Sequence, residues 1–559
     1  MASHERLAAA SPFASSALIR ELIKVLPKDV TFNIYHLSTP PTRASALFSA
    51  PPGARPERTY CESHFLTVSI PTSSAEDDFQ LKETLVFAIE VLIYSTAYSS
   101  TFFVSKADST GYLHLLKLPK GTPSPIRDIS ATFLKYLVEQ RQRPNIQSIV
   151  SLFARAQDQY LFPGSIENSG KHVLDDRGLV KWWCRVLNPL VENLEEQLKT
   201  SQWDTIKGYL VVPGLDTHET ASYIPSKVKP PSAKSPWTTG HPLREISRNS
   251  DVPPRCLVPH FPDDPKSRYL DELDDEITKG TDDASGRWKS VQTIDQFWEM
   301  MAFRQECSAG RLVGFLWVVF TPRLQPPSME SMDDSQTSIA TVESEIWDNG
   351  DSSSLPRVPT LNTSFPVSSQ TCPTNSPLKP SQNMLPISSQ QSETPSRRSA
   401  AEKKKQLTGR IVSRQPKIKT KNKNYLLDRP ETTAYYAWNP EGRGQVVVEE
   451  DDYKRITELL LRLDFANLEL AESSSKRWIN EVRSSAWGDQ SRTWGQSVTG
   501  SRAIEARAAT GATGVNNLMT GLVRKKRKPG AESPVSNGTD QSDAVNVLGA
   551  GMIRKKSKA

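Results

Sequence analysis

Short runs of apolar and β-branched residues recur over the first 320 positions and stop at turn residues, a spacing typical of β-strands. Four runs rich in Val, Ile, Phe and Tyr predict strands of one sheet: residues 64–70, 83–98, 101–106 and 312–320. The longest unbroken apolar runs have about half the roughly 20 residues that a membrane-spanning helix needs. We therefore expect buried strands and no membrane segment.

Other segments repeat their apolar residues at helical spacing: residues 124–144, 175–199 and 290–306. The first begins with Ser124 as its expected N-cap and ends at a proline. Pro189 is expected to kink the second. Thr293 and Gln296 form a capping-box pattern at the start of the third. Strands and helices are mixed without regular alternation and without a glycine-rich nucleotide loop, so the pattern predicts an α+β fold that does not bind dinucleotides or nucleoside triphosphates.

Composition changes near position 325, where Ser, Thr, Pro, Gln and Asn take over and aromatic residues nearly vanish. Such a stretch cannot bury enough apolar surface to fold. Helical spacing returns at Tyr453, Ile456, Leu460 and Leu463, in a segment too short to be stable alone, which we expect to dock onto the first part. We predict a core in residues 1–325, a disordered insertion in 326–424, a helical segment completing the core in 425–485, and a disordered basic tail in 486–559.

Charge and cysteine placement indicate the cellular setting. The chain of 559 residues has a formal net charge of +6, and its cations gather in clusters at 403–423, 523–528 and 553–558. Such clusters serve nuclear import or bind polyanions, although a solvated charged tail explains them too. The five cysteines are scattered without a CxxC pair, so we expect no structural metal. The N-terminus lacks the apolar core of a secretory signal, and we expect no export.

Two segments in the first part of the chain are candidate functional regions. Residues 103–112 end a predicted strand with Lys106 and Asp108 and then turn at Gly111, although a capped strand end alone would explain this pattern. Residues 151–174 bring together rings and cations: Phe153, Arg155, Tyr160, Phe162, Lys171 and His172. Rings can stack on a ligand and cations can meet phosphate oxygens. An ordinary loop with a structural histidine remains the commoner explanation of this second segment by itself.

Two further motifs carry candidate chemistry. The adjacent indoles of Trp182 and Trp183 lie on the second predicted helix, so only one can point fully into the core, and the other is free to line a pocket. Core packing of both indoles is the commoner arrangement. The motif HFPDDPKSRY at residues 260–269 brings carboxylates close to cations: Asp263, Asp264, Lys266 and Arg268. Its proline keeps the preceding Asp264 out of a helix. The group forms either a buried ion-pair network, which is the commoner case, or an acid/base site.

Taken in order, FVSKADSTGY, QYLFPGSIENSGKHVL, KWW, FPDDPKSRY and FWEMMAFRQE resemble the fungal histone acetyltransferase family known as the regulator of Ty transposition. The five motifs are specific as a set and span most of residues 15–320, and the resemblance extends to 425–485. It implies a fold similar to the CREB-binding-protein acetyltransferases, with a central, mostly antiparallel sheet surrounded by helices. The long Ser/Pro-rich insertion departs from the shorter family members.

The resemblance implies acetyl-CoA as the co-substrate. It would lie against the strand end at Ala107 and Asp108. Its phosphates would lie near Pro123 to Arg127, where a helix N-terminus offers free N–H groups and Arg127 a charge. Gln157 replaces a small residue of the family. Together with the rings and cations of residues 151–174, the expected cofactor-binding residues are Ala107, Asp108, Pro123, Ser124, Pro125, Ile126, Arg127, Phe153, Arg155, Gln157, Tyr160, Lys171, His172, Val173, Leu174 and Trp182.

The same resemblance implies catalytic roles. A free lysine has a pKa near 10.4 and is almost fully protonated at neutral pH, so the enzyme must remove a proton or desolvate the amine. Asp264 matches the family's proposed proton acceptor, and Trp183 and Asp263 match residues that shape the pocket, with Asp108 at the strand end. Because Lys266 and Arg268 lie close in the sequence, electrostatic positioning is the alternative role of Asp264. Lys266 matches a residue that becomes acetylated by the enzyme itself, which would remove a charge beside Asp264.

The implied substrate is histone H3 with its partner histone H4, delivered in the nucleus by histone chaperones of the anti-silencing and nucleosome-assembly families. Chromatin assembly and genome stability are the implied roles, and the basic tails could also contact DNA. Two alternatives stay open: a non-enzymatic scaffold that binds chromatin or chaperones through a degenerate core, and acyl transfer to a small amine. The intact FPDDPK motif favours an enzyme, and the basic tails favour a macromolecular nuclear substrate.

Overall fold

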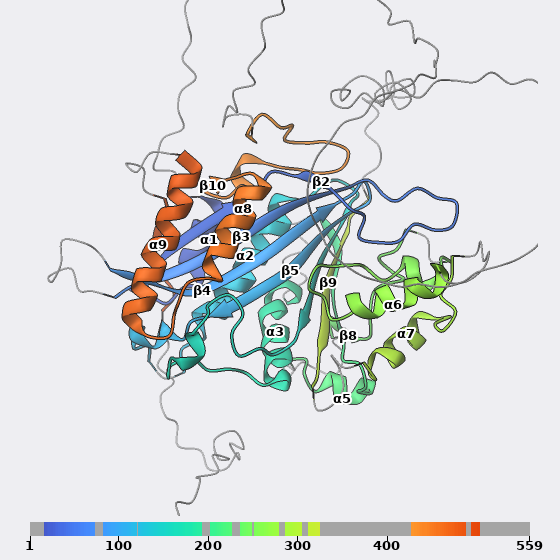
Figure 1. Ribbon diagram of the computed structural model, residues 1–559, viewed down its shortest axis with the longest axis horizontal. Helices are drawn as coiled ribbons and strands as arrows, with labels where there is room; N and C mark the ends of the chain where they lie inside the picture. Colours follow the sequence, from blue (N-terminus) through green and yellow to red (C-terminus); the bar gives the residue numbers. More distant parts are fainter. Residues whose placement is uncertain are drawn as a thin grey trace, which may run out of the picture. The chain divides into compact units, whose positions relative to one another are not determined.

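The computed structural model describes residues 16–72, 82–119, 121–192, 202–225, 235–248, 251–278, 286–304, 311–324, 426–487 and 494–503. These residues form one sheet of 11 strands with helices packed on both faces (Figure 1). Within the described part of the chain, no helix is long and apolar enough to cross a membrane. The expected mixed fold, a central sheet flanked by helices, is confirmed. The predicted insertion at 326–424 lies outside the described residues.

The sheet is mostly antiparallel. Its strands are β1 (Thr31–Ser38), β2 (Thr42–Ala44), β3 (Thr59–Pro71), β4 (Glu83–Ser95), β5 (Ser99–Ser109), β6 (Gln147–Ala154), β7 (Trp203–Val211), β8 (Trp237–Thr239), β9 (Gly314–Pro322), β10 (Val446–Val447) and β11 (Gln496–Thr499). They follow the order β10-β1-β3-β4-β5-β6-β9-β7-β8, with β11 beside β1 and β2 beside β3. Parallel pairs occur between β1 and β10, β5 and β6, and β7 and β8.

The helices cover both faces of the central strands. They are α1 (Ala17–Val25), α2 (Pro125–Gln140), α3 (Asp176–Val191), α5 (Thr217–Ala221), α6 (Ser267–Thr278), α7 (Ile294–Met301), α8 (Glu450–Leu460) and α9 (Leu468–Trp487). On one face of the sheet, the Phe65 ring lies 6.5 Å from the ring of Tyr453 in α8 and 6.0 Å from that of Trp478 in α9. On the other face, His36 contacts Phe133 of α2, with 5.2 Å between ring centroids. Helices α1 and α3 lie on either side of α2.

The predicted helices occur at the expected positions, but their caps and ends differ from the prediction. Helix α2 starts directly after Ser124, yet the Ser124 side chain makes no capping hydrogen bond. Helix α3 ends at Val191, earlier than the predicted residue 199, and Pro189 lies in its last turn. Helix α7 is capped as predicted by Thr293, whose hydroxyl accepts the N–H of Gln296. The Gln296 side chain returns to the N–H of Gln292, one residue before the expected position, so the capping box is incomplete.

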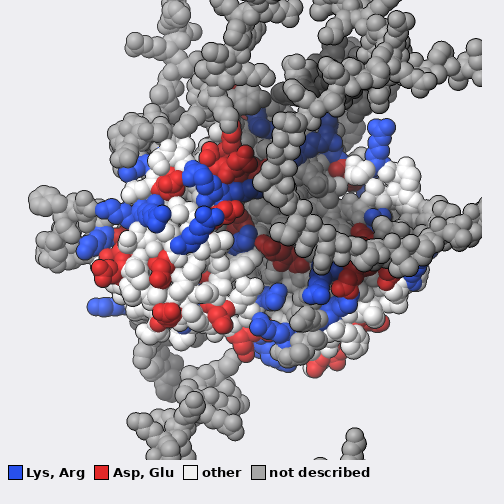
Figure 2. Space-filling view, in the orientation of Figure 1, with Lys and Arg blue, Asp and Glu red and all other residues white. Residues whose placement is uncertain are grey.

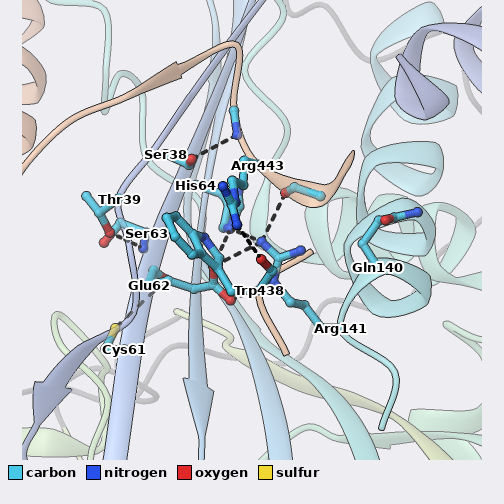
Figure 3. A network of polar contacts seen from close by, with 12 residues as sticks. Ser38, Thr39, Cys61, Glu62, Ser63, His64, Gln140, Arg141, Trp438 and Arg443 are labelled. Atoms are coloured by element: carbon cyan, nitrogen blue, oxygen red, sulfur yellow. Dashed lines mark hydrogen bonds and ion pairs between the residues drawn. The ribbon is translucent and has the colours of Figure 1, made fainter. Parts of the chain in front are cut away.

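The segment after the insertion docks onto the first part of the chain through a buried polar network (Figure 3). Glu62 of β3 accepts two hydrogen bonds from the guanidinium of Arg141, at 2.7 and 3.0 Å. The same guanidinium donates to the carbonyl of Gly442 at 3.0 Å. His64 lies 3.3 Å from Glu62 and 2.9 Å from His36, so two sheet strands, the end of α2 and the docked segment meet at one cluster. A Cβ on Gly442 would lie 2.0 Å from an Arg141 nitrogen, so only glycine fits there.

The folded part continues beyond the predicted boundary at 485. Strand β11 lies in the range assigned to the disordered tail, and it pairs antiparallel with β1. The Trp494 ring lies edge-on to Tyr35 at 4.9 Å, and the carbonyl of Ile479 accepts its indole N–H at 2.9 Å. Sequence periodicity missed this strand because a four-residue strand at a sheet edge carries too few alternating positions to register.

Candidate active site

The site lies where two parallel strands separate. Residues 99–104 of β5 pair with residues 147–152 of β6, but β5 runs on to Ser109 without a partner on that side. A cavity of about 510 Å³ opens at this point. Its walls come from the end of β5, the start of α2, the loop after β6 and the side of α3. A ligand in this cavity would contact both the unpaired edge of β5 and the N-terminus of α2.

Most of the residues expected from the sequence line this one cavity. They are Ala107, Asp108, Ser124, Ile126, Phe153, Arg155, Gln157, Tyr160, Lys171, His172, Val173, Leu174, Trp182, Trp183 and Asp263. Pro123, Pro125, Arg127, Asp264 and Lys266 are not among its lining residues. The Arg127 guanidinium instead donates to the neighbouring Asp128 at 2.8 Å, which turns it away from the cavity. Sequence reasoning missed other lining residues, among them Phe87, Ser105, Leu113, His114 and Leu179, whose strand, apolar or turn context gave no signal.

Asp108 organises the wall of the cavity. One carboxylate oxygen accepts the N–H groups of three consecutive residues, Tyr160, Leu161 and Phe162, at 2.7, 2.9 and 3.3 Å. The other oxygen accepts from the ammonium of Lys171 at 3.0 Å. The Lys171 side chain is only 4% exposed, and its ammonium also donates to the hydroxyl of Ser165 at 2.6 Å. The pair ties the loop after β6 to the end of β5.

Arg155 is the cation best placed to meet a ligand. It lines the cavity, forms no ion pair with any described residue, and its buried Nε makes no hydrogen bond. Beside it, Val173 and Leu174 are each 39% exposed at the mouth, and His172 is exposed. An exposed apolar rim with one free guanidinium suits a long, partly apolar molecule that carries phosphates.

The two adjacent tryptophans are buried to different extents. Trp183 is 5% exposed and belongs to the main hydrophobic core, whereas Trp182 is only partly buried against it. Their rings meet edge to face with centroids 4.8 Å apart. Both line the cavity, so α3 supplies an aromatic wall.

The FPDDPKSRY loop separates into a buried and an exposed half. Asp264 and Lys266 are 5% and 3% exposed and form an ion pair, and the backbone N–H of Lys266 also donates to Asp264 at 2.9 Å. Asp263 has a φ of +57° and turns its carboxylate toward the cavity, 3.6 Å from the ammonium of Lys106. The expectation that Arg268 also faces Asp264 is wrong. Arg268 lies in α6, which starts at Ser267, and points outward to Glu272 at 3.7 Å.

Comparison with known proteins identifies the family. The family described as histone acetyltransferase KAT11-type domain matches residues 18–481 of this chain. The chain belongs to this family.

Among KAT11-type relatives, the histone acetyltransferase rtt109 of Aspergillus flavus is 42% identical over 96% of this chain and 98% of its own length. The histone acetyltransferase rtt109 of Schizosaccharomyces pombe is 36% identical over 44% of this chain and 58% of its own. The crystal structure of Rtt109 from Aspergillus fumigatus matches with a TM-score of 0.61 at 37% identity, covering 87% of this chain and all of that one.

As a KAT11-type histone acetyltransferase, the protein is a protein-lysine acetyltransferase, and acetyl-CoA is its co-substrate. Histones are the substrates of the family, which indicates a nuclear protein acting on chromatin. No group of three or more His, Cys, Asp and Glu side chains that could hold a metal occurs within the described ranges.

Proposed function

We propose that the cavity between β5 and β6 binds acetyl-CoA, and that the protein transfers the acetyl group to a lysine of histone H3. The observation that carries this proposal is the convergence of 15 expected residues, drawn from five separate parts of the sequence, on one cavity at the point where β5 and β6 part. The residues fit the co-substrate: an aromatic wall, an apolar rim and a guanidinium that forms no ion pair with any residue the structure describes. Acetyl-CoA supplies its acetyl group there as a reactive thioester.

The residues of this chain have three tasks in the reaction. Arg155 and the first turn of α2, at Ser124 and Ile126, would hold the phosphates. The Asp108–Lys171 pair fixes the loop that closes one side of the cavity. Trp182 and Trp183 exclude water from the reacting end, which favours the neutral form of an incoming lysine amine.

Asp264 is the proposed acid/base group, and its ion pair with Lys266 keeps its carboxylate from accepting a proton. As long as Lys266 is charged, its ammonium neutralises the Asp264 carboxylate. Acetylation of Lys266 by the enzyme itself would turn the ammonium into a neutral amide and free the carboxylate to receive a proton. We propose that this self-acetylation activates the enzyme.

The proposed setting is the nucleus, with histone H3 presented together with histone H4 by chaperones of the anti-silencing and nucleosome-assembly families. Chromatin assembly and genome stability are the proposed roles. The basic clusters at 403–423, 523–528 and 553–558 lie outside the described residues, and we propose that they contact chaperones or DNA through charge. Binding of this kind weakens as salt screens it.

The test is transfer of labelled acetyl from acetyl-CoA to histone H3, with H4 and each chaperone class, by the full chain. Asp264→Asn should reduce transfer at least a hundredfold, in the range expected for loss of a general base. Asp271→Asn, an exposed carboxylate on α6, is the matched control and should retain full activity. Thermal stabilisation by acetyl-CoA reports whether each variant is folded. A folded wild type that transfers no label with any chaperone would refute the proposal.

Self-acetylation has a separate readout. Incubation with acetyl-CoA alone should add about 42 Da, the mass of one acetyl group, to the wild-type chain at Lys266, and Lys266→Arg should lose that addition. Unchanged histone transfer by Lys266→Arg would show that the modification does not activate the enzyme.

A further inference from the structure

The last described residues of the chain return to the end of α1. Beyond β11, the N–H of Arg502 donates to the carbonyl of Leu26 at 3.0 Å, and the carbonyl of Arg502 accepts the N–H of Lys28 at 2.8 Å. A Cβ on Gly500 would lie 2.1 Å from the carbonyl oxygen of Pro27, so this close approach of two backbones requires glycine. The backbone of Arg502 is therefore fixed, although the sequence placed this residue in the disordered tail.

The side chain of Arg502 reaches the first turn of α2. Its Nη1 donates to one carboxylate oxygen of Asp128 at 2.7 Å, across 374 positions of sequence. The other oxygen of Asp128 accepts Nε and Nη2 of Arg127 at 2.9 and 2.8 Å. The Asp128 side chain is 10% exposed, so one carboxylate, largely covered by protein, holds two guanidinium groups.

Asp128 by itself would oppose the binding of phosphate at this end of α2. A carboxylate in the first turn stabilises the helix dipole, but it repels an anion that binds at the same helix end. Ser124 and Ile126, four and two positions earlier, line the acetyl-CoA cavity. With Arg127 alone, the charges of Asp128 and its partner would sum to zero. The second ion pair, with Arg502, brings the sum to one positive charge.

The charges nearest to the phosphates contribute most to their attraction. On the face of the described residues drawn in Figure 2, basic and acidic side chains are interspersed over α8 and α9, so this face presents no broad basic surface. Salt screens charges that are separated by more than about 10 Å at 0.1 M. Asp128 lies roughly 6 Å from Ser124 along the helix axis, which is within that distance. A single charge at Asp128 therefore acts on a ligand bound beside Ser124.

We propose that Arg502 makes the start of α2 positive and thereby strengthens the binding of the acetyl-CoA phosphates. The inference rests on the proposed function and adds to the co-substrate site a residue from the far end of the folded part. Arg502 is a positioning residue, because it acts through Asp128 and is not among the lining residues of the cavity. Its Nη2 is buried and makes no hydrogen bond to any described residue, which leaves Asp128 as its counter-ion in the described part of the chain.

The test is calorimetry of the full chain with acetyl-CoA at low ionic strength, because the proposal fixes the sign of each change. Arg502→Gln lowers the local charge from one to zero and should weaken binding about threefold to tenfold. Asp128→Asn raises the local charge to two and should strengthen binding by a similar factor. The double variant keeps a charge of one and should bind like wild type. Weaker binding by all three variants would overturn the inference, since an ion pair that only holds the chain end in place would give that result.

Further variants and a second substrate separate charge from structure. Arg502→Lys keeps the charge and should bind acetyl-CoA within about twofold of wild type. Lys135→Gln, the matched control, removes a positive charge from the same helix roughly 10 Å further along its axis and should leave the affinity unchanged. The KM for S-acetylpantetheine, which lacks the nucleotide and its phosphates, should be equal in wild type and Arg502→Gln. In about 1 M salt the differences between the variants should disappear.

Two failures are told apart by the wild type. Equal affinity of wild type, Arg502→Gln and Asp128→Asn for acetyl-CoA would overturn the role of Arg502 and leave the proposed function in place. A folded wild type without affinity for acetyl-CoA would overturn both.

Discussion

Replacing Arg141 by Met should destabilise the protein strongly, because it leaves a buried carboxylate without its counter-ion. The side chains of Arg141 and Glu62 are 1% and 2% exposed, and two hydrogen bonds join them. Arg141→Met keeps an unbranched stem of similar length but removes both bonds and the bond to Gly442. The docked segment therefore loses one of its anchors at the same time.

The magnitude follows from the electrostatics of Glu62. Burial raises the pKa of this carboxyl, but the Arg141 guanidinium and the hydrogen bonds from His64 and Arg141 outweigh it and lower the pKa from 4.5 to about 2. At roughly 1.4 kcal/mol per pKa unit, such a lowering is worth about 3 kcal/mol of folding free energy. Removal of one partner from a buried ion pair typically costs 3–5 kcal/mol, which agrees. We expect Arg141→Met to lose about 3–5 kcal/mol.

The assay is urea unfolding of the full chain, followed by tryptophan fluorescence at pH 7. Lys135→Met is the matched control, because Lys135 lies on the same helix and pairs with Glu139 at 3.8 Å with both side chains about half exposed. Its loss should be under about 1 kcal/mol. The double variant Glu62→Met with Arg141→Met should be more stable than Arg141→Met alone, since no unpaired charge remains.

The pH dependence supplies the decisive check. In Arg141→Met, the guanidinium that does most to lower the pKa of Glu62 is gone, and burial, opposed only by the contact with His64, shifts that pKa upward. Protonation of Glu62 then relieves the defect, so the stability gap to wild type should narrow from pH 7 toward pH 4. A loss below about 1 kcal/mol at pH 7, or a gap that widens on acidification, would refute the reasoning.

Three further outcomes are expected. In wild type, burial lowers the pKa of both His36 and His64, so their contribution to stability is fully present above pH 6.5 and should fall as the pH drops below 6.5. A further loss is expected below pH 4.5, where Glu62 in the unfolded chain takes up protons. The free energy of unfolding, measured as a function of pH, reports both losses. Asp108→Asn leaves the buried Lys171 ammonium without its carboxylate, so the free energy of unfolding should fall by about 3–5 kcal/mol and acetyl-CoA should bind more weakly. Thermal denaturation measures the first effect and calorimetry the second. Wild-type stability together with wild-type affinity would contradict the role of Asp108 in the wall of the cavity. Ser105→Ala removes a buried hydroxyl without a partner, so the free protein should gain up to about 1 kcal/mol of stability by urea unfolding, whereas a clear loss would show that the hydroxyl is already satisfied.

The sequence by itself determined the local elements and the family. The runs at 64–70, 83–98, 101–106 and 312–320 fall on β3, β4, β5 and β9, except for residues 96–98 and 312–313, because β-branched and aromatic side chains pack well on a pleated surface. Pro125 is the first residue of α2, a position where the N–H that proline lacks has no helical partner. The order of five motifs pointed to the acetyltransferase family before any contact was known. Each of these patterns is formed by residues that are close together in the sequence, so it can be recognised without knowledge of the tertiary structure.

Only the tertiary structure decided which charges meet. Lys171 pairs with Asp108, 63 positions earlier, because β5 and the loop after β6 come together in space, a contact that no sequence pattern indicated. Arg268 looked like a neighbour of Asp264, but the start of α6 turns it to solvent. The unpaired Ser105 depends on the register between β4 and β5. Burial and strand register are set by all packed elements jointly, and the free energy of a charge depends on them more than on its neighbours in sequence.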